Sequence, residues 1–238
     1  MRKVLIIGSA PDALQAQNWD SGIFSDIIVI NNAWKIRDDW TFCIFPTDFP
    51  SEKRPKPKKN QNLISAENYV KVQNKFGGFV YAGGTMAFTA GYWALGKLRP
   101  DMMFFLGCDM IYEGKKTHFY GEGKPDPLRK DISLRSLIAK SARLESICFL
   151  NSCKVFNLSS QKKSNLIFER RKIEDVSRIK KIDKLNLKVG KIKKVLKLEK
   201  KHNYFIEDGK YWKHEEKFST SNIDEIDKLW ISVIKNKC

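Results

Sequence analysis

The residues best suited to chemistry lie between Gly107 and Arg129, in a segment without helical or strand periodicity. This segment holds His118, the only histidine of the first 160 residues, together with Tyr112 and Tyr120. A histidine titrates near neutral pH and can remove a proton from a hydroxyl group. Tyrosine hydroxyls can donate hydrogen bonds to a departing phosphate. The segment therefore predicts a functional loop, in which a surface or backbone-bonded histidine is the alternative role of His118.

Other small and polar residues follow the apolar runs of the sequence or precede its best helix. In an open parallel sheet, ligands bind outside the carboxyl ends of the strands, so residues at these places are expected to contact a ligand. The predicted nucleotide-binding set is Gly8, Ser9, Ala10, Pro11, Asn31, Asn32, Thr47, Gly83, Gly84, Thr85 and Asp109.

A phosphate is expected at the turn that begins with Gly8, because such a turn exposes N–H groups and the helix expected from Pro11 adds its positive end. The turn lacks the further glycines of the dinucleotide fingerprint, and the second strand ends in Asn31 rather than an acid, which argues against a nicotinamide enzyme. Asn31 suits a nucleobase edge or a ribose hydroxyl, and equally an ordinary turn. No Gly-Lys-Ser/Thr sequence is present, which excludes a P-loop.

These residues need a parallel sheet to bring them together. Short apolar runs, typical of strands buried on both faces, occupy 3–8, 26–32, 40–45 and 102–107, and 147–150 or 155–158 adds another. Helices are expected over 11–20, over 85–98 with Thr85 as its cap, and over 134–144. Residues 51–60 read as an exposed basic loop. The sequence thus predicts an α/β, Rossmann-like, mostly parallel sheet with helices on both faces in residues 1–160.

Residues 161–238 differ in character and are expected to form a small basic α+β module. They hold 22 basic and 12 acidic residues, against 22 and 15 in residues 1–160. A charged helix is expected within 165–180, and 185–198 fits either a helix or a strand. Asp208-Gly209 between two aromatic arms predicts a hairpin over 204–213, followed by a terminal helix over 222–235.

In the order of its motifs, the region 1–160 resembles the bacterial sialyltransferases of glycosyltransferase family 42. The motifs are Gly-x-x-Pro at Gly8, a strand that ends at Asn31, the small-residue turn at Gly83, a Gly-x-Asp strand end at Gly107, and the His/Tyr loop. The resemblance implies a metal-independent transferase without a cofactor, which moves a sugar from a CMP donor to a glycan or lipid-linked glycan with inversion. It also implies that Tyr112 and Tyr120 stabilise the departing CMP, and that a histidine is the base.

Two positions depart from the family pattern. Glu122 stands where the base histidine belongs, so either His118 or Glu122 is expected to be the base. Tyr81 replaces an arginine before the small-residue turn. A sugar acid other than sialic acid, such as Kdo, is therefore also compatible.

Two other functions fit parts of the sequence. A diphosphokinase of the hydroxymethylpterin type would start with the same Gly-x-x-Pro turn and would hold magnesium through Asp48 and Asp109. A nucleic-acid-binding protein would stack bases on aromatic residues of the expected hairpin. Those aromatic residues are Tyr204, Phe205, Tyr211 and Trp212.

Composition and cysteine content limit the class of protein. With 42% hydrophobic and 12% aromatic residues, the chain is not disordered, and no apolar run is long enough to span a membrane. Its five cysteines form no C-x-x-C pair, and no metal site is predicted. A cytoplasmic protein is expected, with peripheral contact between residues 161–238 and an anionic membrane or acceptor. The net charge of +17 is also explained by a coding sequence that favours lysine, without any anionic ligand.

Overall fold

The computed structural model describes residues 1–112, 117–121, 130–179 and 187–234. Its centre is a seven-stranded sheet in the order β4-β3-β2-β1-β5-β6-β7, and every neighbouring pair is parallel. The expected α/β, Rossmann-like fold is therefore confirmed. The strands are β1 (Lys3–Ile7), β2 (Asp26–Ile30), β3 (Phe42–Ile44), β4 (Asn62–Ile64), β5 (Met102–Leu106), β6 (Lys154–Asn157) and β7 (Glu169–Arg170).

The central strands form because their apolar runs are buried on both faces. In register, Leu5 of β1 lies between Ile27 of β2 and Phe104 of β5, and β2 and β5 are buried throughout. From β1 the chain builds the sheet outward through β2 to β4, and then crosses to β5 on the other side of β1. This change of direction places the carboxyl ends of β1 and β5 side by side, where open sheets bind ligands.

The two edge strands are the ones that the sequence does not reveal. β4 has three residues and β7 has two, and both residues of β7 are exposed, so neither carries an apolar run. The expected charged helix over 165–180 is wrong, because that segment holds β7 and the short helix α5 (Ile173–Val176). Of the two alternatives for the last strand, 155–158 is confirmed as β6, while 147–150 belongs to a helix.

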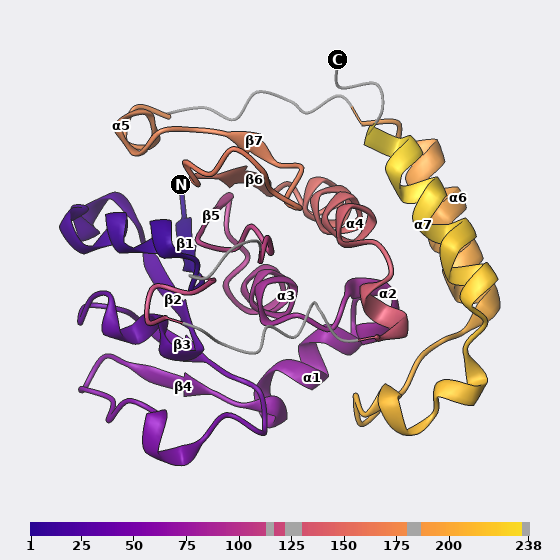
Figure 1. Cartoon of the computed structure of the whole chain (residues 1–238). Helices are drawn as coiled ribbons and strands as arrows, with labels where there is room; N and C mark the ends of the chain where they lie inside the picture. Colours follow the sequence, from indigo (N-terminus) through magenta and orange to yellow (C-terminus); the bar gives the residue numbers. More distant parts are fainter. Residues whose placement is uncertain (113–116, 122–129, 180–186, 235–238) are drawn as a thin grey trace.

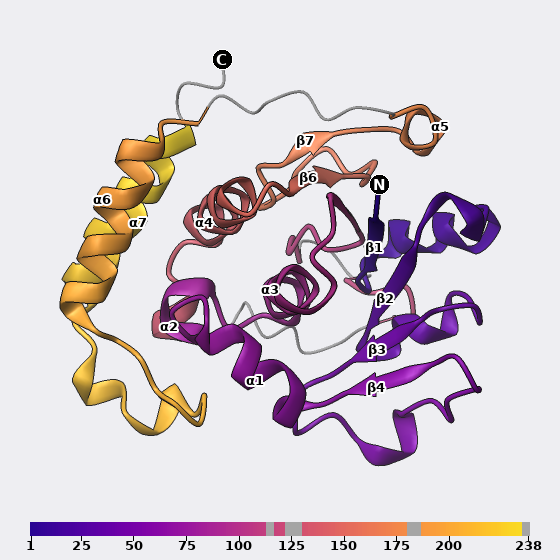
Figure 2. The same cartoon turned by 180° about the vertical axis from the view of Figure 1, so that it is seen from behind.

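Different kinds of helix cover the two faces of the sheet (Figures 1 and 2). On one face lie α1 (Ala66–Asn74), α3 (Met86–Leu98) and α4 (Leu137–Leu150). The other is covered by α5 and by short 3-10 helices, among them Pro11–Asn18, where a helix is expected, and Asn31–Lys35. The cap of α3 is confirmed, since Thr85 Oγ1 accepts the N–H of Phe88 at 3.3 Å.

A further layer lies outside α4, where α6 (Val189–His202) and α7 (Thr220–Ile234) run side by side (Figures 1 and 2). The expected terminal helix is confirmed, and the ambiguous segment is a helix from Val189 onward. Two buried ion pairs fasten this layer to α4. Lys140 Nζ lies 2.7 Å from Asp227 Oδ1 of α7, and Arg143 lies 2.8 Å from Glu199 Oε2 of α6.

The hairpin expected over 204–213 is not formed. Gly209 does adopt a positive φ of 75°, as an Asp-Gly turn requires, but the flanking segments do not pair as strands. Tyr204 stacks on Tyr81, and Tyr211 stacks on Phe79 of α2 (Phe79–Ala82). The aromatic arms therefore pack on the rest of the molecule instead of on each other, which overrides the local hairpin preference.

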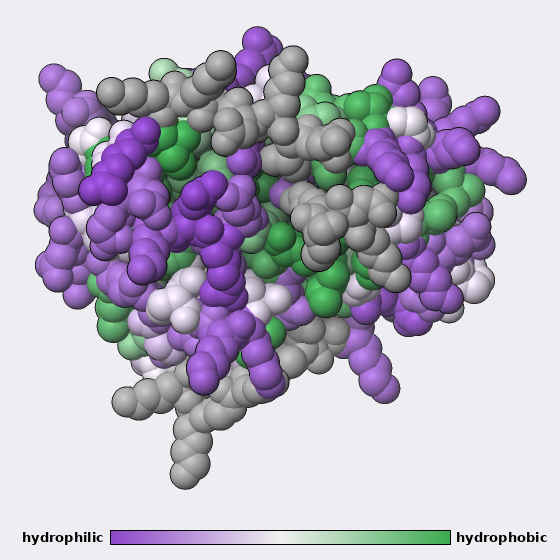
Figure 3. All heavy atoms as spheres, turned by 90° about the horizontal axis from the view of Figure 1, so that it is seen from above, coloured by the Kyte–Doolittle hydropathy of each residue, from purple (hydrophilic) through white to green (hydrophobic). Residues whose placement is uncertain are grey.

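The surface is mixed in polarity. On the face seen in Figure 3, hydrophilic side chains project around the margin, and hydrophobic ones lie between them. None of the helices in the described part of the chain combines the length and the apolarity that a membrane crossing requires.

Candidate functional site

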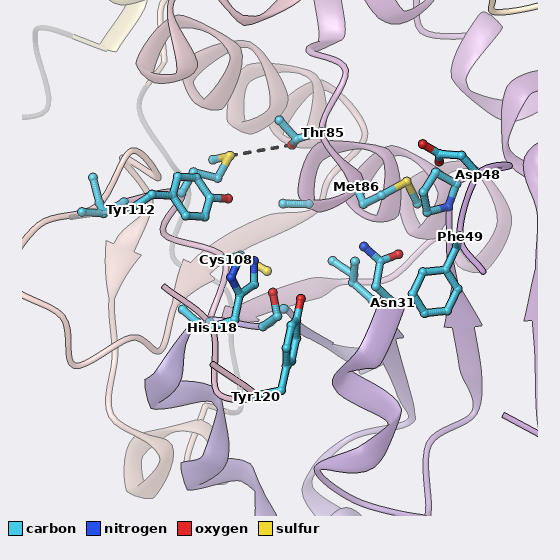
Figure 4. Close-up of a pocket in the computed structure, with 18 of the residues that line it drawn as sticks. Asn31, Asp48, Phe49, Thr85, Met86, Cys108, Tyr112, His118 and Tyr120 are labelled. Atoms are coloured by element: carbon cyan, nitrogen blue, oxygen red, sulfur yellow. Dashed lines mark hydrogen bonds between the residues drawn. The ribbon is translucent and has the colours of Figure 1, made fainter. Parts of the chain in front are cut away.

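A cavity of about 240 Å³ lies at the carboxyl edge of the sheet (Figure 4). Its walls come from segments that follow β1, β2, β3 and β5, and from the start of α3. The expectation that polar strand ends gather at one edge therefore holds for most of them. The predicted residues that line the cavity are Gly8, Ser9, Ala10, Asn31, Asp48, Thr85, Tyr112, His118 and Tyr120.

The other predicted residues lie away from this cavity or outside the described residues. Thr47 is exposed, Asn32 is buried, and Pro11 belongs to the 3-10 helix behind the turn. Glu122 lies outside the described residues, so its prediction as the alternative base stays a prediction. Gly83, Gly84 and Asp109 also do not line the cavity.

The turn after β1 is built for close packing against the end of β5. A Cβ on Gly8 would lie 2.3 Å from the carbonyl oxygen of Gly107, and Gly107 itself has a φ of 65°. The N–H of Gly8 donates to Leu106 O at 2.8 Å, and that of Ala10 donates to Gly107 O at 3.1 Å. These two N–H groups are engaged within the protein, so the phosphate role expected of this turn would fall to other groups of the cavity.

The start of α3 offers such groups. Met86 and Ala87, in the first turn of this helix of 13 residues, line the cavity together with Thr85. The first N–H groups of an α-helix have no partner within the helix, and the positive end of its dipole lies there. An anionic group in the cavity would therefore be stabilised at this helix terminus.

His118 is held between the two predicted tyrosines. Its ring centroid lies 6.0 Å from that of Tyr112 and 5.0 Å from that of Tyr120, with interplanar angles of 29°. In Figure 4 both tyrosine hydroxyls point toward the middle of the cavity. Next to His118, the N–H of Phe119 donates to Ser9 O at 2.9 Å, which fixes this segment on the turn after β1.

The imidazole of His118 is prepared to accept a proton. It is only 8% exposed, and burial lowers its pKa below the ordinary 6.5 of a histidine, so the ring is neutral at pH 7. Its Nδ1 lies 2.9 Å from Thr117 Oγ1. When Nδ1 carries the proton and donates a hydrogen bond to that hydroxyl, Nε2 presents a lone pair.

Asn31 occupies a special backbone position at the end of β2. It has a positive φ of 53°, which asparagine tolerates better than most residues. Its side-chain oxygen is buried and has no hydrogen-bond partner among the described residues. A buried amide oxygen of this kind is suited to accept a hydrogen bond from a ligand.

The described lining of the cavity contains one charged side chain, Asp48, and no lysine or arginine. The second carboxylate expected of a magnesium site, Asp109, is 2% exposed and accepts a hydrogen bond from Asn157 Nδ2 at 3.2 Å. A diphosphokinase would require Asp48 and Asp109 to meet on this cavity, and the structure does not bring them together there.

Gly83 and Gly84 are used for packing. The N–H of Gly84 donates to Ser133 Oγ at 2.9 Å, and a Cβ on Gly84 would lie 2.3 Å from the hydroxyl of Tyr211. Tyr211, expected to stack nucleobases, is thus buried at the turn before α3. Tyr204 is buried too, which leaves Phe205 and Trp212 exposed in that segment.

The sequence pattern does not reveal the apolar part of the lining, which includes Phe49, Met86, Cys108 and Met110. These residues neighbour the predicted strand ends, but their types predict only core packing. Cys108 behaves as a small hydrophobe, since burial raises the pKa of its thiol far above the ordinary value.

In comparisons with known proteins, no protein family, curated protein or solved structure matches this chain.

Proposed function

We propose that the protein is a glycosyltransferase that moves a sialic-acid-like or Kdo-like sugar from a CMP donor to a hydroxyl of a glycan acceptor. The observation that carries this proposal is the neutral, buried His118 between Tyr112 and Tyr120 on a cavity at the carboxyl edge of a parallel sheet. The motif order described above favours this class of transferase over other nucleotide-binding enzymes.

The proposed reaction assigns a role to each group of the cavity. Nε2 of His118 removes the proton of the acceptor hydroxyl as its oxygen attacks the anomeric carbon of the sugar. The bond from that carbon to the phosphate oxygen of CMP breaks, and its electron pair leaves with the phosphate. Tyr112 and Tyr120 donate hydrogen bonds to the departing phosphate, and the first turn of α3 stabilises its charge.

In this scheme Asn31 would accept a hydrogen bond from the nucleoside, because its buried amide oxygen has no partner among the described residues. The cavity, at about 240 Å³, lies just below the range of roughly 300–1,000 Å³ that is typical of ligand pockets, and therefore suits a nucleotide better than a larger cofactor.

The first experiment is a calorimetric titration with CMP, followed by an assay of CMP release from CMP-sialic acid and CMP-Kdo. We expect H118A to lower kcat by a factor of about 10² or more, with little change in CMP affinity. H214A is the matched control, because His214 lies in the C-terminal segment, and it should leave both quantities unchanged.

Two results would contradict these assignments. An absence of CMP binding to the unaltered protein at millimolar concentration would overturn the function as a whole. Full activity of H118A together with a loss of activity in E122Q would keep the function and move the base to Glu122.

The pH profile gives a separate check of His118. Because burial lowers the pKa of its ring, the neutral base form persists below pH 6.5, and the acid limb of kcat should lie below that pH. A limb above pH 6.5 would contradict the role of His118 as the titrating base.

A further inference from the structure

A second cavity, of about 630 Å³, lies at the opposite edge of the sheet. Its walls come from segments 17–19, 34–40 and 55–61, which precede β2, β3 and β4 respectively. Because all strands run parallel, these segments meet at the amino edge, whereas the candidate site lies at the carboxyl edge. We call this cavity the tryptophan groove; its aromatic lining is Trp19, Trp34 and Trp40.

The groove gathers three of the six tryptophans of the chain. Trp40 is buried, whereas Trp19 and Trp34 are partly exposed and line the groove. The indole N–H of Trp34 donates to Lys53 O at 2.9 Å, and this bond fixes the ring in place. Fixed, partly exposed indole rings are platforms on which flat or apolar groups stack.

The same groove is bordered by positive charge. The loop expected to be basic and exposed, residues 51–60, forms part of its wall and exposes Lys53, Lys56 and Lys59. A fourth exposed lysine of this loop, Lys58, is paired with Asp38 of the groove, with Nζ 2.7 Å from Oδ2. Lys35 Nζ lies 5.6 Å from the ring centroid of Trp34. Among the described residues, no carboxylate forms an ion pair with Lys35 or Lys56, so their charge is available to a ligand.

The remaining polar groups of the groove are largely engaged within the protein. Arg37 binds both carboxylate oxygens of Asp39 and the carbonyl oxygens of Ala16 and Trp19. Gln61 donates to Asp38 O and accepts the N–H of Lys58. Few fixed donors and acceptors are therefore left for the hydroxyls of a neutral or acidic glycan. What the groove offers is aromatic surface beside uncompensated ammonium groups.

We propose that the tryptophan groove binds single-stranded nucleic acid, with bases stacked on Trp19 and Trp34 and phosphates placed along Lys35, Lys56 and the adjoining loop. Stacking platforms beside a positively charged track are the combination by which proteins bind single strands without base-specific hydrogen bonds. This site is independent of the proposed CMP site, since the two lie at opposite edges of the sheet.

The test is fluorescence anisotropy with a labelled 12-nucleotide oligothymidine over a series of salt concentrations. We expect W34A to weaken binding at least about fivefold, the lower limit for loss of one stacked base. The double variant K35A/K56A, altered only at exposed side chains, should reduce the slope of log K against log salt by about 1.4, since each phosphate contact on a single strand contributes about 0.7.

Two controls separate the groove from the general positive charge of the protein. W212A tests the C-terminal segment, whose aromatic residues are the alternative place for base stacking; Trp212 is 55% exposed, and if the groove is the site, its loss should leave the affinity unchanged. An abasic 12-mer with the same phosphates should bind at least about fivefold more weakly than oligothymidine, because it cannot stack.

The proposal is overturned if the unaltered protein does not bind oligothymidine at low salt, or if W34A and K35A/K56A bind like the unaltered protein. Equal binding of the abasic strand would also overturn it, in favour of charge alone, and tighter binding of a heparin oligosaccharide would assign the groove to anionic glycans. Calorimetry with CMP reports on the other edge of the sheet, so failure here is distinguishable from failure of the proposed function.

Discussion

At the scale of single residues, Asp12 shows how burial changes the chemistry of a carboxyl group. It is 9% exposed, its Oδ2 accepts a hydrogen bond from Ser159 Oγ at 2.7 Å, and its Oδ1 has no partner among the described residues. Burial raises its pKa above the ordinary 3.8, with the charge of Asp109 as a further cause, while the bond from Ser159 opposes the shift.

The raised pKa gives Asp12 a defined effect on stability. The folded state binds the proton of Asp12 more tightly than the unfolded state does. The contribution of Asp12 to the stability of the fold is therefore favourable below pH 3.8 and is lost as pH rises through the raised pKa. D12N removes the buried charge and keeps an acceptor for Ser159. Its melting temperature should exceed that of the unaltered protein at pH 7.5, and the difference should shrink toward pH 4, as measured by thermal denaturation.

Asp39 provides the control with the opposite sign. Hydrogen bonds from Arg37 lower the pKa of Asp39, so D39N should melt at or below the temperature of the unaltered protein at pH 7.5. A melting temperature of D12N below that of the unaltered protein at pH 7.5 would contradict the raised pKa of Asp12.

At the scale of elements, the turn before α3 connects the candidate site to the C-terminal segment. Ser133 Oγ donates to Asp131 Oδ1 at 2.6 Å and lies 3.0 Å from the hydroxyl of Tyr211, which in turn donates to Asp131 Oδ2 at 2.8 Å. Gly84 packs against the hydroxyl groups of Tyr211 and Ser133, and it precedes Thr85, a residue of the cavity wall. The side chains that fix this turn therefore come from segments 131–133 and 211–213, far from it in the sequence.

This arrangement predicts a coupling between Gly84 and Tyr211. G84A should destabilise the fold by about 1–3 kcal/mol, because its Cβ would meet the tyrosine hydroxyl. Y211F should cost about 1 kcal/mol through the lost hydrogen bonds, but it also removes the oxygen atom with which the added methyl group of G84A would clash. In a double-mutant cycle measured by urea denaturation, the double variant should therefore lose at least about 0.5 kcal/mol less unfolding free energy than the two single variants lose together. Strict additivity would show that the two residues do not meet.

At the scale of the whole molecule, buried charges join the C-terminal helices to the sheet domain. The side chains of Arg143 and Glu199 are 1% and 5% exposed. Glu199 also accepts the indole N–H of Trp230 at 2.8 Å, and Arg143 donates to the hydroxyl of Tyr92 at 2.7 Å. This network links α3, α4, α6 and α7, so the layers are expected to unfold together.

Breaking the network from one side leaves a buried arginine without its counter-ion. E199Q should therefore lower the free energy of unfolding by about 3–5 kcal/mol, within a single cooperative urea transition. The matched control is D224N, which breaks the ion pair of Asp224 with Arg135, whose side chains are 41% and 38% exposed, and should cost less than about 1 kcal/mol. A first transition confined to the C-terminal helices would show instead that this layer folds independently.

The positive charge also has a structural distribution. Six lysines of α6 lie on its exposed face, while its buried residues Ile192 and Val195 belong to the apolar cluster shared with α4 and α7. Contact of this face with an anionic membrane or acceptor stays a prediction. The lysines of the tryptophan groove belong to the other half of the molecule, where the sequence shows less net charge. The structure therefore separates two basic regions that the overall charge of +17 does not distinguish.

The sequence alone determined those features that depend on local patterns. Nearly continuous apolar runs specified β1, β2, β3 and β5, because strands buried on both faces lack the alternation of polar and apolar residues. Thr85 marked the start of α3 through a capping bond within one turn. From these strands, the parallel topology placed nine of the predicted residues around one cavity.

Only the tertiary structure decided the features that depend on residues far apart in the chain. The short edge strands β4 and β7 carry no continuous apolar run and are defined by their pairing with β3 and β6. Gly209 adopts the positive φ of an Asp-Gly turn, but Tyr204 and Tyr211 stack on Tyr81 and Phe79 of the distant helix α2 instead of pairing in a hairpin. The tryptophan groove joins segments that precede three different strands. Local patterns specify elements, whereas contacts between distant side chains decide which surfaces those elements bury and which they leave open to a ligand.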